Sequence, residues 1–396
     1  MPFENSFNAL GLCSLHALLL VSVTYLWMNQ PLELPDEQLI AKTNQIIRYV
    51  LWPDKTLPSL REEFLYINCS YDKTITPFED QFGSGQITIT DREKLAHLLS
   101  IFNDAKHKPK MVVVDLLFEV PSKSDSLLVR ELARSQNFVL GGDPEIGGIK
   151  LPAGIEKAPA NYLTSSGSFF KYPVLNDSVA YLPAALYQYI KNQKGHLSTF
   201  GFVRMGKAWW LNSYIVDLEM RIRFLEEGTL AYLNLGELLA STPAEEIGEG
   251  AKNKIVIIGD IFINDQHDTV LGRQPGPLLV ANAYLSLLRG RAAITWGGSL
   301  LLFVFYYLMS WRILSMTSDP QATTVVTSKF VRFMLKYVSY LITFSLFSVL
   351  LYQLLDKHFQ ILLFAFYFNA LEFIIKRYDG LRKWMQRIVF QQTLQR

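Results

Sequence analysis

The chain has 396 residues, of which 50% are hydrophobic and only 19% are charged, whereas soluble domains average about 25% charged residues. This composition argues against a disordered, collagen-like or disulfide-stapled chain, and two cysteines cannot form a disulfide framework. The 38 basic and 36 acidic residues give a net charge of only +2, so no nucleic-acid partner is expected.

The first long apolar segment covers residues 9–28, the length that a bilayer core of about 30 Å requires of a helix. It has neither the basic start nor the small-residue cleavage site of a secretory signal peptide, so we expect an uncleaved membrane anchor. Its one ionisable residue, His16, is a candidate functional or partner-facing group in the membrane. A hydrogen bond to a hydroxyl of a neighbouring helix, from Ser299 or Ser345, is an equally good explanation.

Residues 29–291 alternate short apolar runs with helical patterns, which predicts a layered α/β domain. The predicted strands are 64–69, 111–118, 138–142 and 254–259. The predicted helices are 91–105, with Thr90 or Asp91 as its N-cap, 124–135, 181–193 and 214–227. Because the strand runs are continuously apolar, we expect a mostly parallel sheet with helices on both faces. The sequence does not predict the strand order within residues 148–250.

Candidate binding residues follow the predicted strand 254–259, at the edge where open α/β sheets bind ligands. They are Asp260, Asp265, His267 and Asp268. Carboxylates and an imidazole could hold a cationic ligand or a divalent metal, but a turn whose aspartates bond their own backbone amides is the favoured explanation, so no metal is expected. Asp115, in the second half of the predicted strand 111–118, is expected either to face the same crevice, with a raised pKa, or to bond the next helix.

No sequence motif of a hydrolase, a zinc protease, a phosphate-binding loop or a redox cysteine pair occurs in the chain. We therefore expect neither an enzymatic activity nor a cofactor.

Three further apolar segments follow the domain: residues 292–311, 337–355 and 359–375. The loop 312–336 and the tail 376–396 are rich in lysine and arginine, so the positive-inside rule assigns both to the cytoplasm. With four spans, residues 1–8 are then cytoplasmic and residues 29–291 lie outside. In a bacterium this means four helices in the inner membrane and a periplasmic domain.

Two features of the C-terminal region are candidates for contacts with a partner. Glu372 lies in the last span, where an ion pair with Lys376, one helical turn further on, would explain it without a partner. In the tail, Trp384 lies on the apolar face of a predicted helix, opposite Lys383 and Arg387. Such a basic amphipathic helix is suited to the surface of the lipid bilayer or to a partner protein.

Two segments carry a family resemblance. In residues 112–132 a buried strand and the following helix start contain Asp115, Phe118, Glu119, Pro121, Ser122 and Asp125. Residues 252–290 contain Gly259, Asp265, Asp268, Gly272, Pro275 and Gly276, followed by Ala281 and Asn282 at the expected start of a helix into the membrane. Together with the order of spans, these segments resemble the CHASE2 family of bacterial extracytoplasmic sensor domains, over about residues 10–375.

The resemblance implies a sensor, and it adds Glu119 to the candidate ligand-binding residues. Two family motifs are altered: the Trp-Pro-Trp-x-Arg stretch keeps only Arg92, and the Asp-Gly-x-x-Arg turn is missing near 168–180. Family members usually continue into a cytoplasmic cyclase, kinase or phosphatase, whereas this chain has about twenty residues after its last predicted span.

We therefore expect a transmembrane receptor subunit that binds a ligand or protein outside the cell and relays to a separate cytoplasmic or membrane protein. It is also a candidate homo-oligomer. The alternative is a structural or assembly subunit of an envelope complex that senses no ligand. A concave pocket with converging polar groups would favour the sensor, and a large exposed apolar patch would favour the assembly subunit.

Overall fold

The computed structural model describes residues 3–31, 35–51, 62–80, 83–142, 149–151, 155, 157–162, 167–315, 329–355, 357–358 and 360–377. The chain forms two compact units. The first unit consists of Met1–Asn44 and Ala293–Arg396, and the second unit is Gln45–Ala292.

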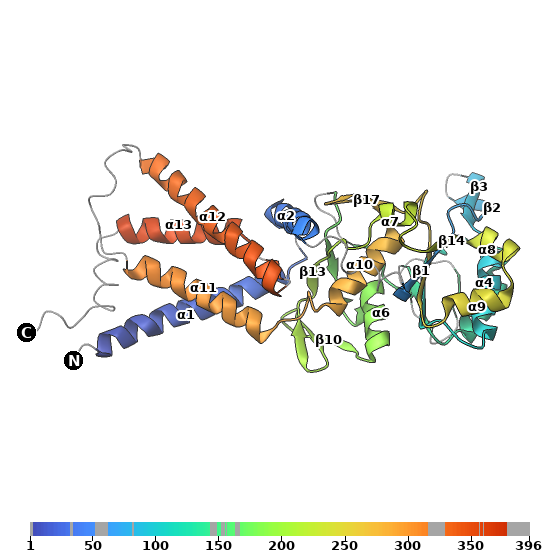
Figure 1. The fold of residues 1–396 in the computed structure, drawn as a ribbon, viewed down its shortest axis with the longest axis horizontal. Helices are drawn as coiled ribbons and strands as arrows, with labels where there is room; N and C mark the ends of the chain where they lie inside the picture. Colours follow the sequence, from blue (N-terminus) through green and yellow to red (C-terminus); the bar gives the residue numbers. More distant parts are fainter. Residues whose placement is uncertain are drawn as a thin grey trace, which may run out of the picture. The chain divides into compact units, whose positions relative to one another are not determined.

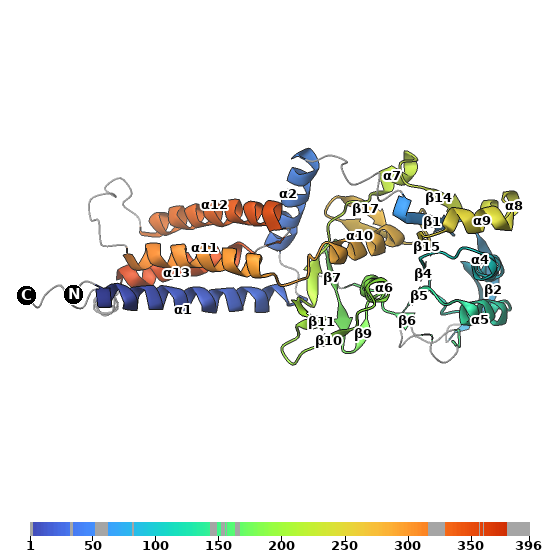
Figure 2. The same cartoon turned by 60° about the horizontal axis from the view of Figure 1, so that its bottom comes forward.

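The second unit is built on a six-stranded parallel sheet (Figure 1), with strand order β14-β1-β15-β4-β5-β6 (Figure 2). Its strands are β1 (Phe64–Asn68), β4 (Met111–Asp115), β5 (Phe138–Gly141), β6 (Lys157–Ala158), β14 (Tyr232–Asn234) and β15 (Ile255–Gly259). The four strands predicted from continuous apolar runs are thereby confirmed, except that β4 ends at Asp115, three residues before the predicted end of 111–118. Two of them, β1 and β15, are buried at every residue, as the interior of a parallel sheet requires.

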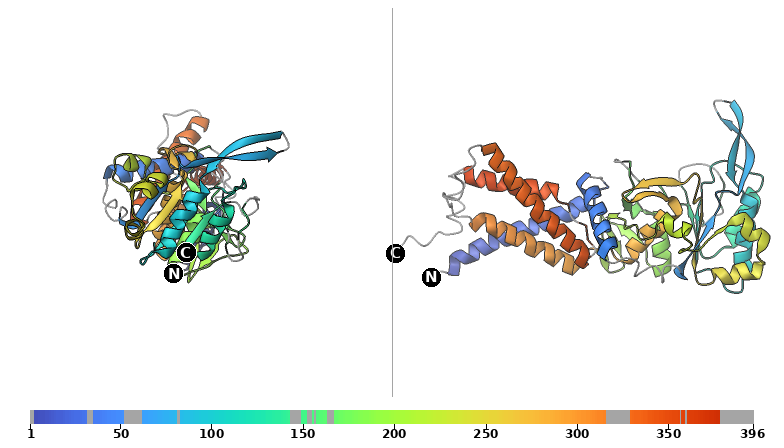
Figure 3. Two further views of the ribbon diagram at one scale, coloured as in Figure 1. Left: turned by 90° about the vertical axis from the view of Figure 1, so that its right-hand side faces the viewer. Right: turned by 45° about the horizontal axis from the view of Figure 1, so that its top comes forward.

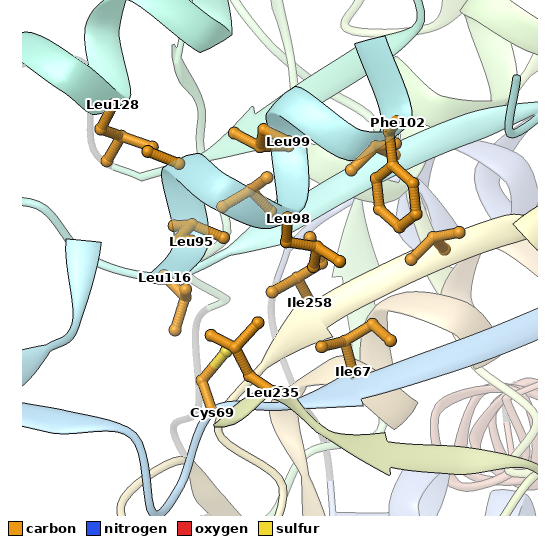
Figure 4. Packing of buried hydrophobic residues seen from close by; sticks show 14 of the residues in the cluster. Ile67, Cys69, Leu95, Leu98, Leu99, Phe102, Leu116, Leu128, Leu235 and Ile258 are labelled. Carbon is orange, nitrogen blue, oxygen red and sulfur yellow. The ribbon is translucent and has the colours of Figure 1, made fainter. Parts of the chain in front are cut away.

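Four helices cover one face of the sheet: α4 (Arg92–Asp104), α5 (Asp125–Arg134), α8 (Leu235–Ser241) and α9 (Ala244–Ala251). In α4, four apolar residues at helical spacing face the core, namely Leu95, Leu98, Leu99 and Phe102 (Figure 4). The N-cap of α4 is Asp91, whose carboxylate accepts hydrogen bonds from the amides of Glu93 and Lys94. The predicted helices 91–105 and 124–135 are confirmed within one residue at each end.

The other face of the sheet carries α6 (Leu182–Lys191) and α10 (Gly276–Leu288), so the prediction of helices on both faces is confirmed. Twelve consecutive residues of α10, Gly276–Leu287, are buried. The prediction that Ala281 and Asn282 open a helix into the membrane is wrong. Both residues lie in the middle of α10, inside the second unit, and the next helix begins only at Trp296.

The predicted helix 214–227 is also wrong, because it is replaced by β13 (Ser213–Ile215), an irregular segment and the short α7 (Ile222–Glu226). Side chains from distant parts of the chain bond the backbone of this irregular segment. The amide oxygen of Gln45 accepts from Leu218 N at 3.2 Å, and that of Asn282 accepts from Met220 N at 2.8 Å. Backbone groups that a helix would pair internally are thus paired with side chains.

Shorter antiparallel elements complete the second unit: β7 (Lys171–Pro173) with β13, β8 (Leu175–Asn176) with β9 (Val179–Ala180), β10 (Gly195–Leu197) with β11 (Val203–Met205) and β12 (Ala208–Trp210), and β16 (Gln266–Thr269) with β17 (Gly272–Pro275). A long hairpin of β2 (Lys73–Asp80) and β3 (Gly83–Thr90) extends away from the body of this unit (Figure 3).

The first unit contains α1 (Phe3–Met28), α11 (Trp296–Ser315), α12 (Lys329–Leu355) and α13 (Leu362–Arg377), with α1 lying along α11 (Figure 2). The helix α2 (Pro35–Leu51) begins in this unit and ends in the second. The helices of the first unit share an aromatic-rich core that includes Tyr306, Phe344 and Phe368.

Two helical stretches among the described residues are long and apolar enough to cross a membrane, Leu10–Met28 and Met334–Leu355. They correspond to the predicted spans 9–28 and 337–355. The other two predicted spans, 292–311 and 359–375, form the helices α11 and α13 but do not meet the same criterion. With 16 residues, α13 is about 24 Å long, which is shorter than a bilayer core of about 30 Å.

Candidate functional site

A cavity of about 650 Å³ lies at the carboxyl edge of the six-stranded sheet. Five of the six side chains predicted to bind a ligand line it: Asp115, Glu119, Asp260, Asp265 and His267. The sixth, Asp268, lies outside the cavity, with a side chain that is 66% exposed and pairs with Arg273. Further parts of the wall come from β3, Lys73, the loop after β4, two tyrosines and the first turns of α10.

Asp115 lies in a row of three residues across the ends of neighbouring strands, and two of the three, Asp115 and Gly141, form the floor of the cavity. Asp115 on β4 is paired with Gly259 on β15, and Gly141 on β5 follows the pair Val114–Leu140. A Cβ atom at Gly259 would lie 2.5 Å from Cγ of Pro277, and one at Gly141 would lie 3.1 Å from Cδ2 of Leu182. The residues beside Asp115 on the two adjacent strands are thus both glycines. A larger side chain at either position would collide with α10 or α6, which approach the sheet closely here.

The carboxyl group of Asp115 has no hydrogen-bond partner within the described part of the chain. Burial, together with the nearby negative charge of Asp265, raises its pKa well above the usual range. The expected shift in pKa is therefore present, whereas the alternative role, in which Asp115 bonds the next helix, is not observed. A carboxyl group that keeps its proton can donate a hydrogen bond to a ligand as well as accept one.

Asp265 and His267 form a pair on the cavity wall, with 2.5 Å between Oδ1 and Nε2. Asp265 packs against the N-terminus of α10, where a Cβ atom at Gly276 would lie 2.0 Å from Oδ2 of Asp265. Glycine at this position therefore allows the carboxylate to approach the positive end of the helix. The ring of Tyr162 meets the imidazole of His267 edge-on, with 5.2 Å between the ring centroids.

Asp260 has a different environment, in which its carboxylate is saturated with hydrogen bonds. Burial alone would raise its pKa, but donors that include Ser70 Oγ at 2.7 Å and Lys73 Nζ at 3.0 Å lower the pKa to about 2. Two backbone amides of its own turn, those of Ile263 and Asn264, donate to it as well. For Asp260, the structure thus matches the favoured explanation of a turn that bonds its own backbone.

Arg92 organises the loop that forms one side of the cavity. Its guanidinium is buried, donates hydrogen bonds to the Asp125 carboxylate and the Val120 carbonyl, and lies over the ring of Phe118. Residues 116–120 of this loop contribute four side chains to the cavity. Arg92, which is retained from the altered family motif, therefore holds the loop in place but does not itself line the cavity.

Several cavity residues were not predicted. Lys73 directly follows the turn after β1, and its ammonium group pairs with Asp260. Tyr162 and Tyr172 come from the region whose strand order the sequence left open. In Tyr172, burial and the nearby Asp115 raise the pKa of the phenol well above its usual range, and its hydroxyl donates to the Ala160 carbonyl at 2.6 Å. The described residues contain no group of three or more His, Cys, Asp or Glu side chains that could hold a metal ion.

In the first unit, His16 bonds hydroxyl groups of two neighbouring helices. Its Nδ1 lies 2.7 Å from Ser310 Oγ on α11, and its Nε2 lies 2.6 Å from Tyr367 Oη on α13. A hydroxyl partner was one of the two expectations, but the partners differ from those proposed. Ser299 bonds Tyr25 instead, at 2.9 Å.

Glu372 also has partners on another helix. It is buried on α13, where it accepts hydrogen bonds from Lys336 and from Tyr340 on α12. The expected explanation, an ion pair with Lys376, stays a prediction, because the structure describes the backbone of Lys376 but its side chain is not among the described residues. The tail residues Trp384, Lys383 and Arg387 also lie outside them, so their predicted membrane or partner contacts remain predictions.

Comparison with known families gave one match, to the CHASE2 domain over residues 72–316. No curated protein and no solved structure matched the chain. The match begins just after β1 and ends just after α11, and thus covers most of the second unit, including the cavity. It is shorter than the resemblance over residues 10–375 but lies within it. The chain therefore belongs to the CHASE2 family of extracytoplasmic sensor domains.

Proposed function

We propose that this protein is a transmembrane sensor subunit whose second unit binds a small polar ligand in the cavity at the sheet edge. The observation that carries the proposal is the convergence of Asp115, Asp265 and His267 on one cavity of about 650 Å³. A volume of several hundred Å³ with a few converging polar groups is typical of small-molecule sites. Membership of the CHASE2 family supports the sensory role.

The chemistry of the wall favours a ligand that both donates and accepts hydrogen bonds. The charges of Lys73 and Asp260 compensate each other, and so do those of His267 and Asp265 when the imidazole is protonated. Asp115 is the floor group that has no partner among the described residues. A hydroxyl or amino group of the ligand bound there would satisfy it.

The relay is proposed to run through α10. Its first turns line the cavity, and its last residue is followed by Arg289, which pairs with Glu219. Between these ends, Asn282 and Ser286 bond the backbone of residues 217–220. A ligand that binds more tightly to one position of α10 would move this segment, and the chain that leads on to α11, toward that position. The difference in binding free energy between the two positions sets how far the equilibrium shifts.

The proposed topology has four spans, α1, α11, α12 and α13, in the inner membrane of a bacterium, with residues 29–291 in the periplasm. The basic segments 312–336 and 376–396 support this orientation. They are also the proposed contact points for a separate cytoplasmic or membrane partner that produces the output. The protein itself carries out no reaction in this scheme, and a second copy of the chain is a further candidate partner.

The alternative, an assembly subunit without a ligand, requires a large exposed apolar surface more than a polar cavity. Exposed apolar side chains occur at several places on the second unit, among them Tyr71, Ile75, Leu117, Phe200 and Trp209. An assembly subunit gives no reason for a polar cavity at the sheet edge, whereas a sensor of small molecules requires one. The cavity therefore supports the sensor over the assembly subunit.

The test is a thermal unfolding screen of the full-length protein in detergent with amino acids, amines, sugars and dicarboxylates. A ligand that binds the folded state at a hundredfold its Kd stabilises it by about 2.7 kcal/mol, which raises the midpoint measurably. We expect a stabilising compound to lose its effect on Asp115→Asn and His267→Gln. The control Asp268→Asn, outside the cavity, should respond as the unchanged protein does.

A compound that stabilises all four proteins equally would bind elsewhere, and the cavity would lose its proposed role. If no compound class stabilised the unchanged protein, while a second envelope protein purified with it in fixed ratio, the assembly subunit would become the better explanation.

A further inference from the structure

The helix α2 departs in part from the usual pattern of polarity. Its buried residues include the polar Asp36, Glu37 and Asn44 beside apolar ones, whereas its exposed residues include Leu39, at 66% exposure, and Ile46 beside Lys42. A helix that faces water shows the opposite arrangement. Polar residues turned to the interior and apolar residues turned outward are expected of a helix that contacts lipid.

The acidic residues on the buried face of α2 have clear roles within the first unit. Asp36 accepts hydrogen bonds from the amides of Ile361 and Leu362, at 3.3 and 3.0 Å, and so caps the N-terminus of α13. Glu37 accepts a hydrogen bond from Gln360. These contacts fix the start of α2 against α13.

An apolar cavity of about 270 Å³ lies between α2, α12 and α13. Its walls include Ile40, Leu341, Val349 and Ile361. The helix α12 contains one of the two stretches able to cross a membrane, and its outward residues next to the cavity are apolar, such as Leu346 at 68% exposure. A dry apolar cavity of about 150 Å³ already binds benzene, so this one has room for several methylene groups.

Asn44 is one of four polar residues that line this mainly apolar cavity, together with Asp36, Thr43 and Ser345. The Asn44 side chain lines the cavity and is 0% exposed. Within the described part of the chain, neither its amide nitrogen nor its amide oxygen has a hydrogen-bond partner. A buried amide without a partner costs free energy, so the site favours an occupant that brings a hydrogen-bonding group to Asn44 and apolar carbon to the walls.

We infer that this cavity is a binding site for a glycerophospholipid, with an acyl chain against the walls from α12 and α13 and a glycerol ester group at Asn44. The inference goes beyond the proposed function and depends on it in one respect, that α12 crosses the bilayer. An ester carbonyl accepts from the amide nitrogen, which a hydrocarbon alone cannot do. The lipid would thereby link α2 to α12 and α13.

The test is photo-crosslinking of the full-length protein in vesicles of phosphatidylethanolamine and phosphatidylglycerol, doped with a phosphatidylcholine that carries a diazirine on one acyl chain. Mass spectrometry of the digested protein maps the label. In the unchanged protein, we expect residues 39–44 and 341–349 to be labelled more strongly than the outward surface around Leu350 and Leu354.

Two substitutions should reduce this label. Val349→Trp fills the cavity, and Asn44→Leu removes the amide group, which should lower labelling of residues 39–44 about fivefold, the value of one neutral hydrogen bond. The matched control Leu346→Trp places the same large side chain on the outward face of α12 and should leave the pattern unchanged. Circular dichroism on each variant verifies that the helices are retained.

The inference would be overturned if residues 39–44 were labelled no more strongly than the outward surface and Val349→Trp left that labelling unchanged. The label would then come only from the lipid of the surrounding bilayer. Alkaline extraction of the same vesicles separates this result from a failure of the proposed topology. A protein that remains in the membrane but shows uniform labelling contradicts only the lipid site, whereas a protein released by alkali contradicts the membrane topology itself.

Discussion

Asp115 and Asp260 lie at the ends of neighbouring strands, β4 and β15, yet their carboxyl groups are in opposite states. Asp260 receives donors from Ser70, Lys73 and its own turn, and its pKa falls to about 2. Asp115 is shielded by α10 and α6 and lies near the charge of Asp265, so its pKa rises well above the usual range. Two carboxyl groups with such different proton affinities are typical of a binding site.

The pKa of Asp115 predicts a pH-dependent stability. The unfolded chain ionises this carboxyl group near pH 3.9, about the ordinary value for aspartate, whereas the folded protein holds the proton to higher pH. The contribution of Asp115 to stability is therefore complete below about pH 3.9 and is lost as the pH rises through the folded pKa. We expect Asp115→Asn, which cannot ionise, to gain in unfolding temperature relative to the unchanged protein as the pH rises from about 4 toward neutral.

The measurement is thermal unfolding followed by tryptophan fluorescence over this pH range, with the exposed Asp268→Asn as control. A difference between Asp115→Asn and the unchanged protein that stays constant with pH would contradict the raised pKa.

At the scale of single residues, the sequence predicted five of the six side chains that were to meet at the sheet edge, because strand ends and loop positions follow from local patterns. It could not predict Lys73 or Tyr162, which reach the cavity from the hairpin and from a region with little regular structure. It also gave no indication that Asp268 would turn away, since one step along β16 reverses the direction of the side chain.

Helices and strands whose limits follow from the local sequence pattern were predicted well. Segments whose conformation depends on side chains far along the chain were not. The leucines of α4 recur on one face and its N-cap is adjacent, so its limits are readable locally. The segment 214–227 has helical spacing, but Gln45 and Asn282 bond its backbone from far along the chain. No local pattern in 214–227 contains that information.

The loop between β4 and α5 depends on Arg92, which gives a prediction at this scale. Arg92→Met leaves Asp125 and the Val120 carbonyl without the donors that now pair them. Loss of one partner of a buried pair costs about 3 kcal/mol, which corresponds to a fall in unfolding temperature of roughly 6–12 °C for a domain of this size. The exposed Lys123 in the same loop should also become more susceptible to trypsin.

Thermal unfolding and limited proteolysis check this expectation, with Arg273→Met as control. Arg273 pairs with Asp268, and both side chains are about two-thirds exposed, so its removal should change stability by less than about 1 kcal/mol. Equal effects of the two substitutions would show that Arg92 has no special role in the loop.

For the whole molecule, the fold class of the second unit followed from the sequence, but the number of membrane spans did not. Apolar composition alone suggested four spans, whereas two helical stretches among the described residues are both long and apolar enough. A short helix such as α13 is apolar enough to be predicted as a span. With 16 residues, however, it is too short to cross a bilayer core on its own. Polar contacts between helices, such as that of Glu372 with Tyr340, let such a helix lie within a bundle.

The topology can be decided by cysteine labelling, because both native cysteines, Cys13 and Cys69, are buried. We expect a membrane-impermeant maleimide to label Lys123→Cys in intact spheroplasts, and to label Ser318→Cys and Arg387→Cys only after lysis. With four spans, α11 separates position 123 from position 318. The unsubstituted protein provides the background.

A two-span protein, with only α1 and α12 in the bilayer, gives a different pattern, since positions 123 and 318 would then lie on the same side and position 387 on the other. Labelling of both Lys123→Cys and Ser318→Cys in intact cells would therefore remove α11 from the membrane and with it the proposed relay from α10 into a span. Protection of Lys123→Cys with labelling of Arg387→Cys would invert the molecule. In that case the cavity would face the cytoplasm, and the protein could not sense a periplasmic ligand.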